Sequence, residues 1–295
     1  MTAALERGTR PPVTVTDGGG RRRANRRVWL LVLPLVGFVV LLFVLPFVAV
    51  ARSGFGEMTA GQVSGFSVEN YATFLGSSLY LKALLNTLII GAATVVLAAL
   101  AGLPYAYLLR TKPRLRTFAI FALFAPLLVN GVVRVYGVQL LVRAVNRGLA
   151  ALGIPELPVL YSMYGIVIGM VLFMFPQMTI AIYASLDRMD DRLAEAARTL
   201  GAGRWQIIRH VVLPHARPGL VAGGVLTFAA AAGSYLGPAM LGGGKVVTMP
   251  TLIYSSFSAT GDWSFGAAVA TILTVVLLPI MAYSMVRSMR AERDG

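Results

Sequence analysis

Six long apolar segments, separated by shorter polar ones, dominate the pattern of this 295-residue chain. The hydrocarbon core of a bilayer is about 30 Å thick, so a helix that crosses it needs about 20 apolar residues. Each segment is long enough, and together they cover residues 28–51, 83–109, 117–142, 160–186, 218–241 and 265–286. The pattern therefore predicts an all-α, polytopic membrane protein with six transmembrane helices.

Composition supports this class and excludes several others. The chain is 57% hydrophobic and 13% charged, whereas a soluble globule has about a quarter charged residues and a disordered chain is more polar still. It has no cysteine and two histidines, so we expect no disulfide, no metal centre and no cysteine nucleophile. The net charge of +14 could indicate nucleic acid, but the basic residues flank the apolar segments instead of gathering on one folded face.

The distribution of lysine and arginine predicts the topology. Twenty of these residues lie in the tails and in the connections 110–116 and 187–217, whereas the alternate connections carry five. By the positive-inside rule, the richer segments are cytoplasmic. Both termini are therefore expected in the cytoplasm, with the chain as a multi-pass protein of the cell inner (plasma) membrane.

The N-terminal segment combines a basic region with the first apolar segment. Residues 1–27 are rich in arginine, contain three consecutive glycines and lack apolar periodicity, which predicts a disordered basic cytoplasmic tail against anionic membrane lipid. A cleavable signal peptide is the rival interpretation of residues 1–51, but its apolar region would be about 7–15 residues long, against 24 here. Residues 28–295 are expected to form one membrane domain, with a short external helix near 68–75.

The connection 187–217 has a helical pattern. Apolar residues recur at steps of three and four, which marks one face of a helix: Leu186, Met189, Leu193, Ala197 and Leu200. Gly201 follows where a left-handed backbone commonly ends a helix. A second short helix, with Trp205, Ile208 and Val212 on one side, is predicted to end at Pro214. Each apolar stripe must be covered, and one of them can rest against the bundle. Docking of a partner and a plain connector lying on lipid fit the periodicity equally.

Within this connection the sequence Glu195-Ala196-Ala197, then Gly201, then Val211-x-Leu213-Pro214 resembles the EAA loop of binding-protein-dependent ABC importer permeases. That pattern is Glu-Ala-Ala, three residues, Gly, nine residues and Ile-x-Leu-Pro, so Val211 is the single departure. The resemblance implies that the loop inserts into a cleft of a cytoplasmic ATPase subunit. Glu195 and Arg198 would face that partner, Gly201 would supply the turn, and Leu213-Pro214 the return to the membrane.

The same resemblance implies a permease subunit without enzymatic activity or cofactor of its own. Its partners would be ATP-binding cassette ATPase subunits, a second permease subunit (a copy or a paralogue) and a solute-binding protein. Further motifs are similar to the spermidine/putrescine permease branch, among them Asn86-Thr87, Pro104-Tyr105-Ala106-Tyr107 and Arg134-Val135-Tyr136. That branch carries acidic residues near the end of the fifth span, whereas residues 233–239 here contain none. A polyamine-like or related organic solute is expected, and the sequence leaves its identity open.

The predicted spans contain no Asp, Glu or His and a single ionisable residue, Arg134. Ion-coupled transporters usually need carboxylates or histidines within their spans. The glycines before Lys245 lack the spacing of a phosphate-binding loop, so the chain has no nucleotide site of its own. A separate ATPase is therefore expected to supply the energy; a self-sufficient channel or facilitator is the alternative. Four residues are candidates for lining the pathway: Asn130, Arg134, Ser234 and Tyr235. For Arg134 a structural or gating role is favoured over contact with the solute.

Overall fold

The computed structural model describes residues 33–34, 36–59 and 62–293, so the predicted tail 1–27 lies outside the described residues. The chain divides into two units, residues 1–49 and 50–295, and each is described by itself. In the first unit the π-helical turn η1 (Val40–Val44) leads into α2 (Leu45–Gly54), which ends in the second. The helix over Val36–Gly54 is long and apolar enough to cross a membrane, in agreement with the first predicted span.

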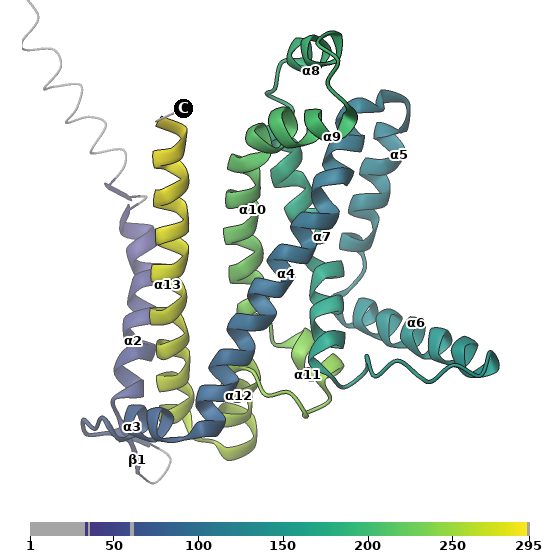
Figure 1. The fold of residues 1–295 in the computed structure, drawn as a ribbon. Helices are drawn as coiled ribbons and strands as arrows, with labels where there is room; N and C mark the ends of the chain where they lie inside the picture. Colours follow the sequence, from purple (N-terminus) through teal and green to yellow (C-terminus); the bar gives the residue numbers. More distant parts are fainter. Residues whose placement is uncertain (1–32, 35, 60–61, 294–295) are drawn as a thin grey trace, which may run out of the picture. The chain divides into compact units, whose positions relative to one another are not determined.

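The second unit is built around three long helices. These are α4 (Ser78–Thr111), α7 (Met163–Leu186) and α10 (Leu213–Ala232), and α7 packs against both of the others (Figure 1). Between them lies a core of Ala98, Met178 and Ile182. The helix α13 (Trp263–Arg293) packs against α10. In lipid, helices associate chiefly through close packing of small residues, and α10 supplies Gly219 and Gly223 where it meets α7.

The connections of this unit fall at two opposite ends (Figure 1). One end carries α8 (Asp191–Thr199), α9 (Arg204–Ile207) and the start of α5 (Pro113–Phe124). The other carries α3 (Glu69–Gly76), α11 (Leu236–Gly242) and α12 (Met249–Ser255), which continues into the π turn η4 (Ser256–Thr260). The two basic connections 110–116 and 187–217 therefore share one end, as the charge pattern predicted.

The described part of this unit also contains one small β-sheet. The strands β1 (Glu57–Thr59) and β2 (Gln62–Ser64) form an antiparallel hairpin in which Glu57 pairs with Ser64. The hairpin lies in the connection before α3, outside the spanning helices, so the all-α prediction for the membrane part is confirmed. The short external helix expected near 68–75 is α3.

The third predicted span is not one straight helix. α5 and the 3-10 turn η2 (Ala125–Leu128) are followed, after a bend of 106°, by α6 (Gly131–Ala151). Pro126 has no N–H to continue the α-helical hydrogen bonds, and the side chain of Asn130 starts a new helix by accepting a 2.8 Å hydrogen bond from Val132 N. Among the described residues, five helices are each long and apolar enough to cross a membrane, and the number of spans is six if the bent pair counts as one span.

Two predictions about the fifth span were also wrong. The helix before it does not stop at Pro214: α9, the π turn η3 (Ile208–Val212) and α10 form one continuous helix. A π turn adds a residue to the helical turn. Here it ends two residues before Pro214, whose ring would otherwise crowd the preceding turn. At its other end α10 stops at Ala232, nine residues before the predicted limit, with Gly233 as its C-cap.

Candidate functional site

The loop between α7 and α10 is shaped by local hydrogen bonds. Asp190 caps α8, because its carboxylate accepts a 2.9 Å hydrogen bond from Arg192 N. At the other end Gly201 adopts φ +83°, a left-handed conformation that costs most other residues about 1–2 kcal/mol. Gln206 then accepts a 2.7 Å hydrogen bond from Gly203 N and starts α9. The predicted order of helix, glycine turn and helix is therefore present. The first helix is shorter than predicted, because α8 starts at Asp191, so that Leu186 ends α7 and Met189 lies in the turn between them.

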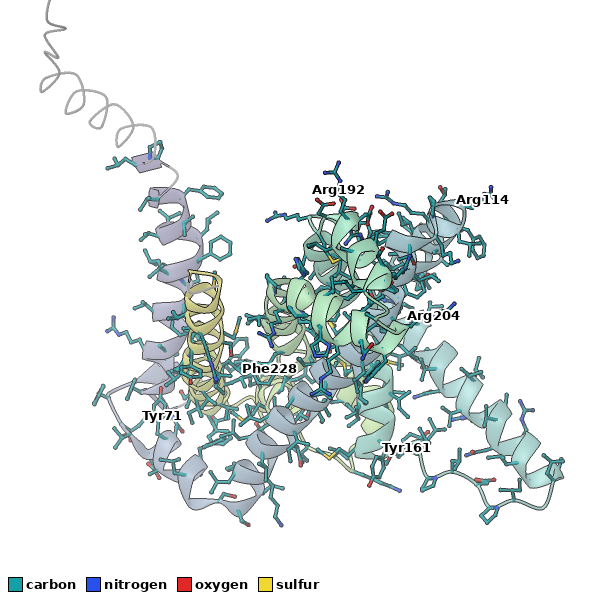
Figure 2. All side chains as sticks on the ribbon, turned by 45° about the horizontal axis from the view of Figure 1, so that its top comes forward. Tyr71, Arg114, Tyr161, Arg192, Arg204 and Phe228 are labelled. Carbon is teal, nitrogen blue, oxygen red and sulfur yellow. The ribbon has the colours of Figure 1, made fainter. Side chains whose placement is uncertain are left out.

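The outer surface of this loop carries charged and apolar side chains together. Glu195, Ala196 and Arg198 are exposed and Ala197 is half-buried; Arg192 projects outward at the same end (Figure 2). Leu193, Leu200 and Trp205 are 45%, 87% and 72% exposed. At these three positions the bundle does not cover the apolar stripes. The small side chains of Ala194, Ala197 and Ala202 make that contact instead, which leaves the large ones free to meet a partner.

The return to the membrane is firmly packed. Ile207, Val212 and Ala216 are buried in the core that α4 and α7 also line, and Val211 packs against it. Leu213 is half-buried and Pro214 exposed. The hydroxyl of Ser185, near the end of α7, donates a 2.7 Å hydrogen bond to His215 O on α10. The second half of the motif therefore fixes the loop to the bundle, whereas the first half is presented outward.

Sequence reasoning missed one residue that holds the loop. Arg110, in the last turn of α4, donates hydrogen bonds from its guanidinium to Leu186 O at 2.6 Å and to Met189 O, and it forms a 2.6 Å ion pair with Asp191. In the sequence it was one of four basic residues in a short connection. Its acceptors lie 76 to 81 residues away, so no local pattern could have revealed the contact.

The pathway candidates of the third span lie at its break. Asn130 caps α6, so its side chain is used locally. The Arg134 guanidinium carbon lies 4.3 Å from the ring centroid of Phe173 on α7. Its Nε and Nη1 are enclosed and make no hydrogen bond within the described part of the chain. The cation is therefore stabilised by the aromatic face, and the side chain of Asn130 is not its partner.

The candidates of the fifth span also lie at a break. Ser234 and Tyr235 occupy the turn between α10 and α11, and Tyr235 stacks on Tyr254 of α12 with a centroid separation of 4.3 Å. The next residue, Leu236, packs against Gly131 at the start of α6. The structure thus brings the breaks of the third and fifth spans together, and all four candidates lie around this junction.

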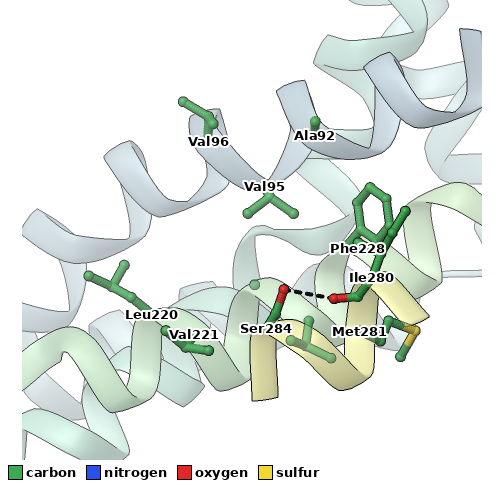
Figure 3. Close-up of a pocket in the computed structure, with 11 residues that line it drawn as sticks. Ala92, Val95, Val96, Leu220, Val221, Phe228, Ile280, Met281 and Ser284 are labelled. Carbon is green, nitrogen blue, oxygen red and sulfur yellow. Dashed lines mark hydrogen bonds between the residues drawn. The ribbon is translucent and has the colours of Figure 1, made fainter. Parts of the chain in front are cut away.

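A separate groove of about 360 Å³ lies between α4, α10 and α13 (Figure 3). Val95, Leu220 and Phe228 are among its lining residues. Its one hydroxyl donor, Ser284, is already bonded at 2.9 Å to Ile280 O within α13. A charged solute would find no compensating group there, so we do not place the pathway in this groove.

Comparison with known proteins decides what this architecture belongs to. Residues 94–291 match the family described as binding-protein-dependent transport system inner membrane component. The chain belongs to this family. It is a permease of an ABC importer and a multi-pass protein of the inner membrane, as its sequence predicted.

Relatives of this permease share most of its length. The spermidine/putrescine transport system permease protein PotB of Salmonella typhimurium (strain LT2) is 30% identical over 258 residues, which cover 84% of this chain and 89% of that protein. PotB of Escherichia coli (strain K12) is 29% identical over 264 residues, covering 86% and 95%. A probable molybdenum ABC transporter permease protein of Haloferax volcanii is 31% identical over 255 residues, covering 83% and 88%.

Solved structures share the fold of the permease. A chain of a bacterial ABC transporter involved in the import of the acidic polysaccharide alginate has a TM-score of 0.74 and 18% identity, covering 92% of this chain and 98% of that one. A second structure of a bacterial alginate ABC transporter, in complex with an alginate pentasaccharide-bound periplasmic protein, has a TM-score of 0.72 and 16% identity, covering 92% and 96%. At this identity the likeness concerns the fold.

Proposed function

We propose that this permease forms part of the translocation pathway for a polyamine-like or related organic solute, and that a separate ATP-binding cassette ATPase drives it through α8. The observation that carries the proposal is the surface of α8. It presents Glu195 and Arg198 beside exposed Leu193 and Leu200. A mixed charged and apolar surface at the end of a membrane bundle is suited to a protein partner.

The proposed sidedness follows the charges. The end with α8 also carries Lys112, Arg114 and Arg116 at the start of α5, and segments rich in lysine and arginine stay in the cytoplasm. The termini and α8 would then be cytoplasmic, where an ATPase has access. Closure of the ATPases would displace α8, and the bundle would alternate between outward-open and inward-open states.

The opposite end would receive the solute. It holds a hollow of about 750 Å³ whose lining includes the charged residues Arg143, Arg147 and Glu156, and these charges are suited to a charged face of a solute-binding protein. A second permease subunit, a copy or a paralogue, would complete the pathway at the junction where the breaks of the third and fifth spans meet, near Arg134 and Tyr235. The similarity to PotB supports a polyamine-like solute.

Uptake into sealed proteoliposomes tests this function. The permease is isolated with its associated proteins from its native membrane, and uptake of spermidine, putrescine and molybdate is measured with and without internal ATP. We expect ATP-dependent uptake of a polyamine that falls at least about tenfold, equivalent to 1.4 kcal/mol, in Glu195→Lys. The matched control, Glu57→Lys in β1 at the opposite end, should retain it.

Two other outcomes contradict parts of the proposal. Uptake that proceeds without ATP and is unaffected by Glu195→Lys would indicate a self-sufficient facilitator. ATP-dependent uptake of molybdate but of neither polyamine would leave the coupling intact and show that the proposed solute class is wrong.

A further inference from the structure

Arg110 joins the ends of three helices through one guanidinium group. It belongs to the last turn of α4, and its side chain is only 9% exposed. Nη1 donates to the carbonyl of Leu186, the last residue of α7, while Nη2 donates to Met189 O and to the carboxylate of Asp191, the first residue of α8. The group therefore bonds to α7, to the turn that follows it and to α8.

The chemistry of these contacts makes the junction strong. The last carbonyls of a helix lack partners within that helix and carry partial negative charge, so they favour a cation. Hydrogen bonds from an ionised donor are about twice as strong as those between neutral groups. The planar fork of arginine can meet several acceptors in fixed directions, which the single ammonium group of lysine cannot do.

The remaining attachments of α8 are slight by comparison. Its contacts with the bundle involve the small side chains of Ala194 and Ala197, while Leu193 is exposed. A push on α8 would therefore reach the bundle chiefly through Arg110 and the turn after α7. Coupling over such distances requires a continuous series of packed or bonded groups.

The helix α4 provides that continuity. It has 34 residues, about 50 Å at 1.5 Å per residue, and so extends to the opposite end of the bundle. There Thr87 accepts a hydrogen bond of 2.8 Å from Met249 N, and Asn86 donates one of 3.0 Å to Val247 O. A displacement received at Arg110 would thus be delivered to α12, whose Tyr254 stacks on Tyr235.

We propose that Arg110 is a positioning residue that transmits the movement of α8 to α4, so that ATPase closure at one end alters the pathway at the other. This inference rests on the proposed function, because it requires an ATPase that moves α8. Arg110 transmits the movement of α8 to α4, whereas other residues bind the ATPase.

The test uses the whole importer and a reporter at the far end of α4. The chain has no cysteine, so Lys82→Cys, an exposed position in α4, gives a single site for a membrane-impermeant maleimide. Labelling rates are compared with and without trapping by ATP and vanadate. The same preparations are assayed for co-isolated ATPase and for ATP hydrolysis. Each is made with native Arg110, with Arg110→Gln or Arg110→Lys, or with the control Arg114→Gln, an exposed arginine four residues along.

With native Arg110 and in the Arg114→Gln control, trapping should change the labelling rate. In Arg110→Gln we expect the ATPase to stay bound and active while that change falls at least about fivefold, the lower end of typical coupling. Arg110→Lys, which keeps the charge and so the fold, should show an intermediate loss. An unchanged response in both variants would overturn the proposal, as would loss of the ATPase itself. If the native permease isolates no ATPase, the proposed function fails first, and the inference with it.

Discussion

Thr87 and Met249, 162 residues apart, share a buried hydrogen bond. The Thr87 hydroxyl accepts from Met249 N at 2.8 Å and donates to Ala83 O at 2.8 Å. Met249 is the first residue of α12, where backbone N–H groups lack helical partners. The side chain of Thr87, in the second span, therefore caps α12 in the connection between the fifth and sixth spans, which gives the Asn86-Thr87 motif a structural role.

We predict that Thr87→Val destabilises the permease. Valine keeps the shape of threonine but leaves the N–H of Met249 buried without an acceptor, which costs about 1–3 kcal/mol. Thermal unfolding in detergent should occur at a lower temperature than in the native protein. Thr87→Ser retains the hydroxyl and should lose less stability. Equal unfolding temperatures for Thr87→Val and the native protein would show that the cap does not matter.

A second prediction concerns the contact between α7 and α10. A Cβ on Gly219 would lie 2.4 Å from Ala181 O and 2.8 Å from Ile182 Cα, whereas one on Gly224 would meet only Val95 Cγ1 at 3.4 Å. Because the backbone of α7 cannot yield as a side chain can, Gly219→Ala should cost about 1–3 kcal/mol through overpacking. Gly224→Ala should unfold at nearly the native temperature. The account of this interface fails if the two variants are equally stable.

The break in the third span gives a third prediction. Asn130→Ala removes the acceptor of Val132 N, and losing such a cap costs about 1 kcal/mol. Hydrogen exchange should become faster in the first turn of α6, at Val132 and Val133, while exchange in α7 stays unchanged. Asn130→Asp keeps an acceptor and should retain protection. Unchanged exchange in Asn130→Ala would show that Pro126 alone sets the break.

The sequence predicted the features that depend on solvent. The lengths of the apolar segments predicted the spans, and the distribution of lysine and arginine predicted which connections share one end. Both signals arise because lipid favours apolar residues and water favours charged ones along the whole chain. Local chemistry gave the turn at Gly201. It did not reveal that the helix that starts with α9 continues past Pro214. The π turn η3, which accommodates the proline, has no compositional signal of its own.

The candidate site was predicted in part for the same reason. The loop from Glu195 to Pro214 is contiguous, so a motif could identify it. Two features depend on contacts between distant parts of the chain: the junction at Arg110 and the stacking of Arg134 on Phe173. Periodicity showed that the stripes with Leu193 and Trp205 need to be covered, but it could not show what covers them, and both residues are exposed on this chain.

Cross-linking from α8 tests the central claim most directly. Leu200→Cys places the only cysteine of the chain on an 87% exposed position beside the turn at Gly201. A cysteine-linked photoreactive probe in intact native membranes should then form an adduct with an ATP-hydrolysing subunit. Lys82→Cys at the far end of α4 should form none with that subunit. If Leu200→Cys instead reacts with impermeant reagents from outside the cell, or its adducts contain no ATPase, the account of an importer driven through α8 is contradicted.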